Sequence, residues 1–384
     1  MSADVIVVGA GVIGASIAYH LSQADVAVTL VDRAGPAFAP SASWASAGGL
    51  RTQGRHAAER PLSMRAAIRW RELQCELGAD LEVVFGGHLH VAEDEREAEA
   101  VRSRVADEAA DGVEIELLHF PDIRRVAPGI TERALLGAYT PADGQAHPGL
   151  TAAAFAHAAA RHGAVLRFGA ACDLSIGANG VEGVRLADGE RIKGELTVIA
   201  AGAWSVALLD GIGLRLPLRW RGLQALLSEV AAPALAPTVT AVGRNLSLKQ
   251  SPSCQFMIGG GWFGTMAGDH VETHPVEAHV ARQWDVAATI FPPIARLRLA
   301  QTWAGAEAQT IDALPFIGRA QMRGLYLATG FSNHGFQISP AVGELVRDDI
   351  VNGQEALLAP FRPARAAGVG TEAIEAFVAE PISL

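Results

Sequence analysis

The chain has 384 residues, half of them hydrophobic, which suits one large domain or two interleaved domains. Its formal net charge of −10 disfavours nonspecific nucleic-acid binding. Three cysteines, Cys75, Cys172 and Cys254, lie far apart without a C-x-x-C pair, so we expect no metal site and a reducing compartment. With no signal-peptide pattern and no run of about 18 apolar residues, a cytoplasmic protein without a transmembrane segment is expected.

The first predicted elements are a strand, a helix and a second strand. The apolar run Val5–Val8 is typical of a buried parallel strand, and Ala27–Val31 forms the second. Glycines spaced as G-x-G-x-x-G open the helix between them. An acidic residue ends the second strand, so the segment has the full fingerprint of a dinucleotide-binding βαβ unit.

Each residue of this fingerprint has a physical role. Gly9 permits the tight turn, Gly11 lets the backbone approach a pyrophosphate, and Gly14 allows close packing of helix against strand. The helix N-terminus offers free N–H groups to the phosphates, and Asp32 can accept hydrogen bonds from ribose hydroxyls. The fingerprint alone does not separate FAD from NAD.

The middle of the chain alternates helical and extended patterns. Residues 60–78 are predicted to be helical, and "VVFGGHLHVAED" is predicted to be a strand or hairpin. Glu93–Ala110 is predicted as a charged helix with a solvated face. A helix starting near Pro148, a hairpin and the apolar strand Thr197–Ala201 follow.

The last third is predicted to be β-rich over residues 215–303, interrupted by a helix near residues 275–290. After the buried strand in "GLYLATG", we expect a helix capped by Ser339 with Pro340 at its first position. The last 20 or so residues are rich in alanine and are predicted to form a loosely attached helix.

This order of elements predicts a mixed α/β protein, with a Rossmann-type domain interleaved with an antiparallel-sheet substrate domain. We assign residues 1–80, 140–214 and 304–365 to the nucleotide-binding domain, 81–139 and 215–303 to the substrate-binding domain, and 366–384 to a C-terminal tail. Because "GAGVIG", "AAGAW" and "GFSNHGF" each follow an apolar strand, all three are expected to converge on one ligand.

Four segments, in order, resemble the superfamily of FAD-dependent D-amino-acid, glycine and sarcosine oxidases. They are "VIVVGAGVIGASIAYHL…VTLVDR", "SASWASAGGLR", "VIAAGAWSVAL" and "WAGAEAQTIDALPFIGRA…GLYLATGFSNHGFQISPAVGELV". The resemblance favours FAD over NAD. The "WAG-x-E" and "GFQ" patterns are most similar to bacterial dehydrogenases of D-amino acids or D-hydroxyproline.

The resemblance also implies which residues hold FAD. Ser43–Leu50 would run beside the flavin ring, Cys172 would lie near the adenine, and Gly330–Gln337 would pass the pyrimidine end of the flavin. Backbone N–H groups there, before a helix, are suited to stabilise negative charge on the ring. The residues expected to contact FAD are Gly9, Gly11, Val12, Ile13, Gly14, Asp32, Arg33, Ser43, Ser46, Ala47, Gly48, Gly49, Leu50, Cys172, Ala201, Gly202, Trp204, Gly305, Gly330, Asn333, His334, Gly335, Phe336 and Gln337.

The sequence departs from its relatives at three places. Monomeric sarcosine oxidases attach their flavin through a cysteine before the final strand; none follows Cys254 here, so noncovalent FAD is expected. Glycine and D-amino-acid oxidases have a carboxylate-binding arginine where this chain has Glu307. Sarcosine oxidases have a lysine where Gln337 stands and another near Met257 that helps oxygen react, and both are absent.

Four residues are candidates for the chemistry: Arg51, Glu307, His334 and Gln337. Arg51 matches a substrate-binding arginine of sarcosine oxidases and could clamp a carboxylate, although a structural role stays open. Glu307 would face the substrate amine, or be a wall residue paired with an arginine. His334 would act as an acid or base, or orient the flavin or a neighbouring loop.

Two other groups receive a structural interpretation. His88 and His90 share one side of a strand, but no third metal ligand is evident, so a structural role is expected. Lys249 would either line the substrate pocket or lie exposed, and an exposed position is the expectation.

The leading hypothesis is an enzyme that oxidises the C–N bond of a small amino or imino acid, with a dehydrogenase favoured over an oxidase. A second hypothesis is a catalytic or electron-transfer subunit of a hetero-oligomeric complex of the amine, opine or sarcosine oxidase type. A third is a non-catalytic FAD-binding protein. The expected partners are therefore the small-molecule substrate and an electron acceptor or partner subunit.

Overall fold

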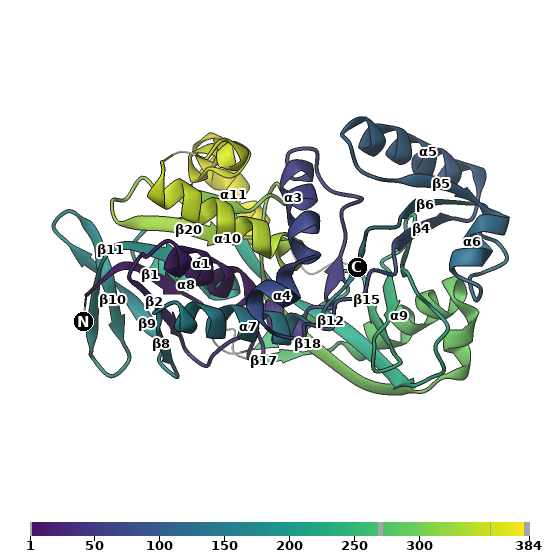
Figure 1. Ribbon diagram of the computed structural model, residues 1–384, viewed down its shortest axis with the longest axis horizontal. Coiled ribbons are helices and arrows are strands. Elements are labelled where there is room, and N and C mark those ends of the chain that lie inside the picture. The colour runs from purple at the N-terminus through teal and green to yellow at the C-terminus, as the bar shows by residue number, and fades with distance from the viewer. Residues whose placement is uncertain (1, 268–271, 354, 380–384) are drawn as a thin grey trace.

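The computed structural model describes residues 2–267, 272–353 and 355–379. Two main sheets lie at opposite ends of an elongated molecule, and helices cover both (Figure 1). The predicted mixed α/β architecture is thus confirmed. Among the helices in these ranges, none combines the length and apolar character needed to cross a membrane.

The first sheet carries the dinucleotide fingerprint. Its central strands run parallel in the order β8–β2–β1–β11–β20, with β19 antiparallel at one edge and the β9–β10 hairpin beside β11. Its strands are β1 (Ser2–Val8), β2 (Val28–Asp32), β8 (Val165–Phe168), β9 (Cys172–Gly177), β10 (Gly180–Leu186), β11 (Arg191–Ile199), β19 (Phe316–Arg319) and β20 (Leu325–Thr329). The parallel arrangement brings the carboxyl ends of β1, β2, β11 and β20 to one edge.

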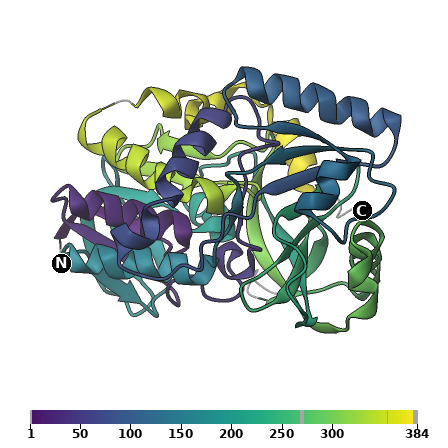
Figure 2. The same ribbon diagram turned by 45° about the vertical axis from the view of Figure 1, so that its right-hand side comes forward.

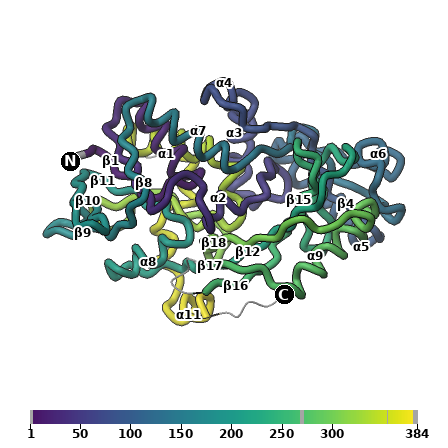
Figure 3. Tube along the Cα trace, turned by 90° about the horizontal axis from the view of Figure 1, so that it is seen from below, coloured from purple at the N-terminus to yellow at the C-terminus, as the bar shows by residue number. Residues whose placement is uncertain are grey.

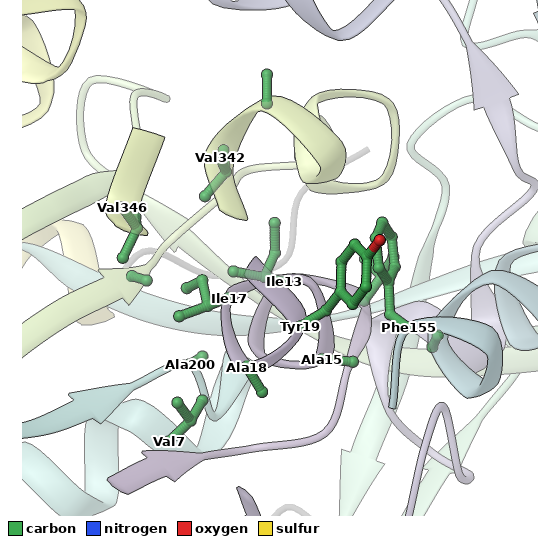
Figure 4. Close-up of a cluster of buried hydrophobic side chains, with 14 of the residues drawn as sticks. Val7, Ile13, Ala15, Ile17, Ala18, Tyr19, Phe155, Ala200, Val342 and Val346 are labelled. Atoms are coloured by element: carbon green, nitrogen blue, oxygen red, sulfur yellow. The ribbon is translucent and has the colours of Figure 1, made fainter. Parts of the chain in front are cut away.

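Helix α1 (Val12–Gln23) lies at the centre of this half of the molecule. It is buried on nearly all sides because it packs on the sheet and between α7 (Pro148–Arg161) and α10 (Gly335–Val351). Figure 4 shows Ile17 and Ala18 of α1 among Val7, Ala200 and Val346, with the Tyr19 ring tilted beside that of Phe155. This packing fixes where α1 begins, and therefore where its free N–H groups point.

The second sheet supplies the other half. Its strands run in the order β17–β16–β12–β15–β14–β13–β4–β6–β5, with β18 also paired to β12. They are β4 (His88–Ala92), β5 (Glu116–His119), β6 (Leu136–Thr140), β12 (Leu218–Val230), β13 (Thr238–Ala241), β14 (Ser247–Gln250), β15 (Gln255–Gly259), β16 (Phe263–Ala267), β17 (Glu272–His274) and β18 (Leu299–Thr310). Most neighbours are antiparallel, but β13 and β4 are parallel. Helix α5 (Glu95–Ala110) lies against β4 and β6 (Figure 2).

The remaining elements connect or cover these sheets. A short ladder joins β3 (Gly49–Leu50) to β7 (Gly144–Gln145). The predicted helix over residues 60–78 is two helices, α3 (Arg60–Trp70) and α4 (Leu73–Leu77). The others are α2 (Ala42–Ala45), α6 (Phe120–Val126), α8 (Ser205–Asp210), α9 (Glu277–Ile290) and the 3-10 helices η1 (Gly202–Trp204), η2 (Pro292–Arg296), η3 (Ala356–Phe361) and η4 (Pro363–Gly368).

The start of α10 corrects the sequence prediction. Ser339 does not cap this helix and Pro340 is not its first residue, because the helix begins at Gly335 and contains Pro340 in its interior. Pro340 has no N–H to donate to the carbonyl of Phe336. The Ser339 hydroxyl donates to that carbonyl instead, at 2.8 Å. The helix therefore starts one turn earlier, immediately after the loop at the carboxyl end of β20.

The tail forms the predicted helix, and it is loosely attached. No residue of α11 (Thr371–Ala379) is buried, and the helix packs against β12 at the lower edge of the view in Figure 3. The Arg219 guanidinium lies 4.0 Å from the centre of the Phe377 ring and also donates to the Phe377 carbonyl. Residues 380–384 of the predicted tail lie outside the described residues. The expected division into domains stays a prediction, and β18 runs across its boundary at residue 304.

Candidate active site

One large cavity, of about 980 Å³, runs from the carboxyl ends of the parallel strands to the second sheet. Every residue that the sequence singled out for cofactor binding or chemistry lines it, with one exception. Gly14 lies outside because it packs against the turn between β1 and α1, where a side chain would collide with the Gly9 carbonyl.

The turn after β1 leaves open space for a ligand. Gly9 has a φ of +107°, and a Cβ there would collide with the backbone of Ala200. A Cβ on Gly11, by contrast, would meet only the Ser43 hydroxyl, at 3.1 Å. Gly11 therefore has no side chain that would keep a ligand away from its backbone, as close approach of a pyrophosphate requires.

Side chains from two other segments hold this turn in place. Ser43 Oγ accepts a hydrogen bond from the Val12 N–H at 2.9 Å, so α2 helps to fix the first turn of α1. The Asp32 carboxylate accepts from the N–H groups of Ala10, Ala34 and Gly35 at 2.7–2.8 Å. A carboxylate has about four lone-pair sites, so one remains for a ribose hydroxyl.

The walls of this end of the cavity come from β2, β9 and η1. The Arg33 guanidinium lies 4.0 Å from the centre of the Trp204 ring, and both residues line the cavity. Burial raises the pKa of the Cys172 thiol to about 12, so this cysteine remains an uncharged thiol at neutral pH. Cys172 lies at the start of β9.

At the other end, the loop after β3 is held by successive hydrogen bonds. The Thr52 N–H and hydroxyl both donate to Asp143, and the Gln53 side chain donates to the His88 carbonyl at 2.9 Å. The Gly54 N–H donates to Glu108 at 2.8 Å. This network orders the loop, so the two arginines that flank it, residues 51 and 55, are held in place before any ligand arrives.

Arg51 and Arg55 share this loop with their charges close together. Arg55 Nε donates to the Arg51 carbonyl at 3.0 Å, and both side chains line the cavity. Burial, together with the charges of Arg55 and Arg104, lowers the pKa of Arg51 to about 9. The cavity therefore contains a fixed patch of positive charge opposite the dinucleotide end.

Arg104 is a cavity residue that sequence reasoning missed. It lies on α5, which was expected to present only a solvated charged face, yet it lines the cavity with a side chain 31% exposed. Nothing in the sequence distinguishes it from the other charged residues of that helix. Only the packing of α5 against β4 and β6 turns this position inward.

Glu307 lies on β18, where relatives have an arginine. Its Oε1 accepts a hydrogen bond from the Asn333 N–H, and Asn333 adopts a left-handed φ of +71°. Among the described residues, Oε2 has no hydrogen-bond partner. Burial raises the pKa of Glu307 to about 8. At neutral pH it is therefore mostly a neutral carboxyl group that borders the cavity.

His334 and Gln337 both contact the helix α3 region. His334 Nδ1 lies 2.8 Å from Glu59 Oε2, and burial lowers the pKa of His334 to about 4, so the imidazole is neutral. The Gln337 amide is bonded at both ends to Ser63, donating to its carbonyl and accepting from its hydroxyl, each at 2.9 Å. The Gln337 side chain thus fastens α10 to α3.

His88 and His90 share one partner. Both imidazoles lie within hydrogen-bond distance of Thr240 Oγ1, at 2.9 and 2.7 Å. Burial lowers the pKa of His90 to about 3, and that of His88 falls well below its usual value for the same reason. Over the ranges that the structure describes, no three His, Cys, Asp or Glu side chains gather as metal ligands.

Lys249 is buried, and the expectation that it lies exposed is wrong. Only 4% of it is exposed, because β14 lies inside the second sheet. It stands directly opposite Met257 of β15 and lines a second cavity of about 260 Å³. Ser46 and Ala47 border both cavities. Burial lowers the pKa of the Lys249 ammonium to about 7.

Comparison with known proteins places this geometry in a family. The family model described as FAD dependent oxidoreductase matches residues 4–348. A glycine oxidase from Geobacillus kaustophilus is 30% identical over 96% of this chain and 99% of its own. The chain belongs to the FAD dependent oxidoreductase family.

Other relatives extend the likeness over nearly the whole chain. Sarcosine oxidase subunit beta from an Arthrobacter species is 27% identical, over 94% of this chain and 90% of its own. The crystal structure of L-proline dehydrogenase from P. horikoshii superposes with a TM-score of 0.87 at 26% identity, covering 95% of this chain and 97% of that one. The predicted family, the enzyme class and FAD as cofactor are thereby confirmed.

The described residues fit FAD. The bare backbone at Gly11, the N-terminus of α1 and the Asp32 carboxylate suit its pyrophosphate and ribose. Ser43–Leu50 and Gly330–Gln337 border the stretch between this end and the arginines, where the flavin ring would lie. In the family, FAD supplies the acceptor for the electrons that leave the substrate.

Proposed function

We propose that the protein oxidises the C–N bond of a small amino or imino acid to an imine, transferring a hydride from the substrate carbon to N5 of FAD. The position of Arg51 carries the proposal. Its guanidinium lines the cavity directly after the segment Ser46–Leu50, on a loop fixed by hydrogen bonds. A guanidinium in such a place can clamp the carboxylate of an amino acid with two parallel hydrogen bonds.

Other residues of this chain would complete the reaction. A substrate that arrives as an ammonium ion must lose a proton before a hydride can leave its carbon. With a pKa of about 8, the ionised fraction of Glu307 would accept that proton, and this fraction grows as the pH rises toward 8. Neutral His334, beside Glu59, would position the loop before α10. The first turn of α10 would place its positive end against the cofactor.

The names of the relatives support this substrate class. One is a glycine oxidase and another is an L-proline dehydrogenase, so amino-acid oxidation occurs on this fold at 26–30% identity. We infer a D-amino acid, a proline-like or hydroxyproline-like imino acid, or another secondary amine as substrate, bound to noncovalent FAD.

Anaerobic mixing of the holoenzyme with a panel of amino and imino acids tests the proposal. The panel contains both enantiomers of alanine, aspartate, glutamate, proline and 4-hydroxyproline, together with glycine and sarcosine. At least one compound should bleach the flavin absorbance at a rate that saturates with concentration. If none does, the non-catalytic alternative gains and the enzyme proposal is refuted.

The position of Lys249 supports a second candidate for the electron acceptor, namely oxygen. A dehydrogenase was favoured since no lysine stands at Met257, yet Lys249 lies opposite that position in a cavity bordered by Ser46 and Ala47. A buried cation near the flavin would stabilise superoxide-like charge during reaction with oxygen. The oxidase alternative therefore rests on this ammonium group.

Rapid mixing of reduced enzyme with oxygenated buffer distinguishes an oxidase from a dehydrogenase. In an oxidase, reoxidation is fast with stoichiometric peroxide, and Lys249→Met slows it at least tenfold without changing anaerobic flavin reduction. Slow reoxidation of the unmodified enzyme, unaffected by Lys249→Met, supports a dehydrogenase with another acceptor. Arg191→Met on β11, an exposed position, is the control that removes a surface charge.

A role as one subunit of a larger complex is the remaining alternative, in keeping with the relative named sarcosine oxidase subunit beta. It predicts that the isolated chain transfers electrons slowly to small acceptors. Purification from the native cell, followed by mass measurement and assay, decides: a fully active particle containing this chain alone excludes the complex.

A further inference from the structure

The end of the cavity beyond the predicted flavin site contains more positive charge than one carboxylate requires. Four arginines line it, Arg51 and Arg55 from the loop after β3, Arg104 from α5, and Arg244 from the turn after β13. Arg244 is neutralised by Glu93 and Glu97, with Nη2 at 2.7 Å from the Glu93 carboxylate. The charges of Arg51, Arg55 and Arg104 are opposed by three nearby carboxylates, Glu59, Glu108 and Asp143.

The carboxylates near these three arginines lie behind them rather than in the cavity. Asp143 accepts from Thr52, Glu108 accepts from the Gly54 N–H, and Glu59 faces His334. None of the three carboxylates lines the cavity. The closest contact of Arg104 with Glu108 is 4.0 Å, the outer limit of an ion pair. The surface that a ligand would meet is thus cationic, with its counter-charges on the far side.

The arginines approach one another from two directions. A Cβ placed on Gly54 would lie 3.4 Å from Arg104 Nη1 and 4.0 Å from Arg51 Nη1, so the two guanidiniums flank the same point. Arg55 is 6% exposed, and its Nη1 has no hydrogen-bond partner among the described residues. A buried guanidinium nitrogen without a hydrogen-bond partner is costly unless a bound anion completes it.

This arrangement exceeds what a monocarboxylic substrate would use. Arg51 alone can take one carboxylate in a bidentate pair. Arg104 comes from another element, and its carboxylate partner Glu108 is 4.0 Å away and does not line the cavity. We propose that the substrate is a dicarboxylic amino or imino acid, with one carboxylate on Arg51, the second on Arg104, and Arg55 bridging the two. This inference rests on the amino-acid oxidation proposed above and specifies its substrate class.

The test compares dicarboxylates with their uncharged amide analogues in the holoenzyme. Aspartate, glutamate and iminodiacetate are matched with asparagine, glutamine and iminodiacetate monoamide, and the dissociation constant is taken from anaerobic flavin reduction. We expect each dicarboxylate to bind at least tenfold more tightly than its amide, the range for a charge-assisted hydrogen bond. Equal constants for both members of every reacting pair would overturn the inference.

Substitution of Arg104 tests whether this residue causes the preference for dicarboxylates over their amides. Arg104→Gln should reduce the ratio between dicarboxylate and amide to near one, and Arg104→Lys should leave an intermediate ratio because it keeps the charge but loses the fork. Arg102→Gln on the same helix is the matched control and should keep the full ratio. The Arg102 side chain is 42% exposed and, among the described residues, forms ion pairs only with Glu95 and Glu99. An unchanged ratio in Arg104→Gln would refute the role of Arg104.

A second readout does not depend on turnover. Succinate and malonate, which have no C–N bond to oxidise, should perturb the flavin absorbance at concentrations at least tenfold lower than butyrate and propionate do. If no amino acid reduces the flavin but these dicarboxylates still bind selectively, the proposed reaction fails while the anion pocket stands. If monocarboxylic amino acids reduce the flavin and dicarboxylates show no preference in either assay, only the dicarboxylate inference fails.

Discussion

At the scale of single residues, the glycines of the fingerprint have two different roles. One faces the cofactor cavity, and another is needed for the packing of the fold. Gly11 has an ordinary φ of −61°, and an added Cβ would meet only the Ser43 hydroxyl, at 3.1 Å, whereas a side chain on Gly14 would collide with the Gly9 carbonyl. The two positions belong to one motif, but only the first faces the cavity. Their substitutions should therefore fail in different ways.

Gly11→Ala should weaken FAD binding at least tenfold, because its methyl group occupies the space that a pyrophosphate needs, and should change apoprotein stability by no more than about 1 kcal/mol. Gly14→Ala should destabilise the apoprotein by several kcal/mol, as overpacking against backbone does. FAD titration and urea unfolding of both apoproteins measure these effects. Equal loss of stability in the two variants would contradict the distinction.

Glu307 leads to a prediction about how the stability of the apoprotein depends on pH. Its pKa rises from 4.5 to about 8 in the folded apoprotein, so between these values the folded state holds a proton that the unfolded state releases. Its contribution to the free energy of unfolding is therefore complete below pH 4.5 and is lost as pH rises through about 8. Glu307→Gln removes this loss, and its stability relative to the unmodified protein should increase from pH 5 to pH 9.

Urea unfolding of the two apoproteins at pH 5, 7 and 9 measures this difference. The exposed Glu114→Gln is the control and should show the same small difference at every pH. A flat difference for Glu307→Gln would mean that its carboxyl group ionises normally in the folded protein.

At the scale of elements, the contact between α1 and α10 positions both helix N-termini at the cavity. The Ser16 hydroxyl of α1 donates to the Ser339 carbonyl of α10 at 2.9 Å, and Gly343 lies where the helices approach most closely. A Cβ on Gly343 would collide with Ser16 Oγ and lie 2.7 Å from His20 Nδ1. Any side chain there must push the helices apart.

Gly343→Ala should therefore destabilise the protein by about 1–3 kcal/mol, the usual cost of overpacking, although alanine favours a helix more than glycine does. It should also weaken FAD binding, since the start of α10 would shift from the cavity. Gly368→Ala, where an added Cβ meets nothing within 4 Å, is the matched control. A stabilised Gly343→Ala variant would show that the helices do not touch there.

At the scale of the whole molecule, the cavity joins the two sheets. Its walls include the carboxyl ends of β1 and β11 from the first sheet, and Thr238, Thr240 and Ser247 from the second. FAD and a substrate would thus be held between the two halves.

Binding of FAD to the apoprotein should stabilise it by about 2.7 kcal/mol at a free concentration of 100 times the dissociation constant. Hydrogen exchange should slow at residues 9–14, 43–55, 200–204 and 330–337, which border the cavity from several elements. Helix α6 and strand β5, which do not line it, should exchange as before. Protection confined to residues 9–14 would contradict binding across the whole cavity.

Much of the site could be read from the sequence because its parts are local. Gly9, Gly11 and Asp32 lie within one βαβ unit, whose strand and helix periods are visible in the chain itself. The segments around Gly202 and Gly330 follow apolar strands, and parallel strands bring their carboxyl ends together. For these residues, the order of elements was enough to place them at one ligand.

The rest depended on contacts between distant segments. Arg104 belongs to a helix of ordinary charged pattern. Lys249 belongs to a strand whose buried side faces a cavity bordered by residues far away in the sequence, such as Ser46 and Ala47. Ser339 belongs to a helix whose first turn is settled by the loop before it. The sequence by itself determined a dinucleotide fold and its cofactor end, because short-range periodicity encodes both. Only the tertiary structure decided the charge of the substrate end, because that charge arises where side chains from the loop after β3 and from α5 meet.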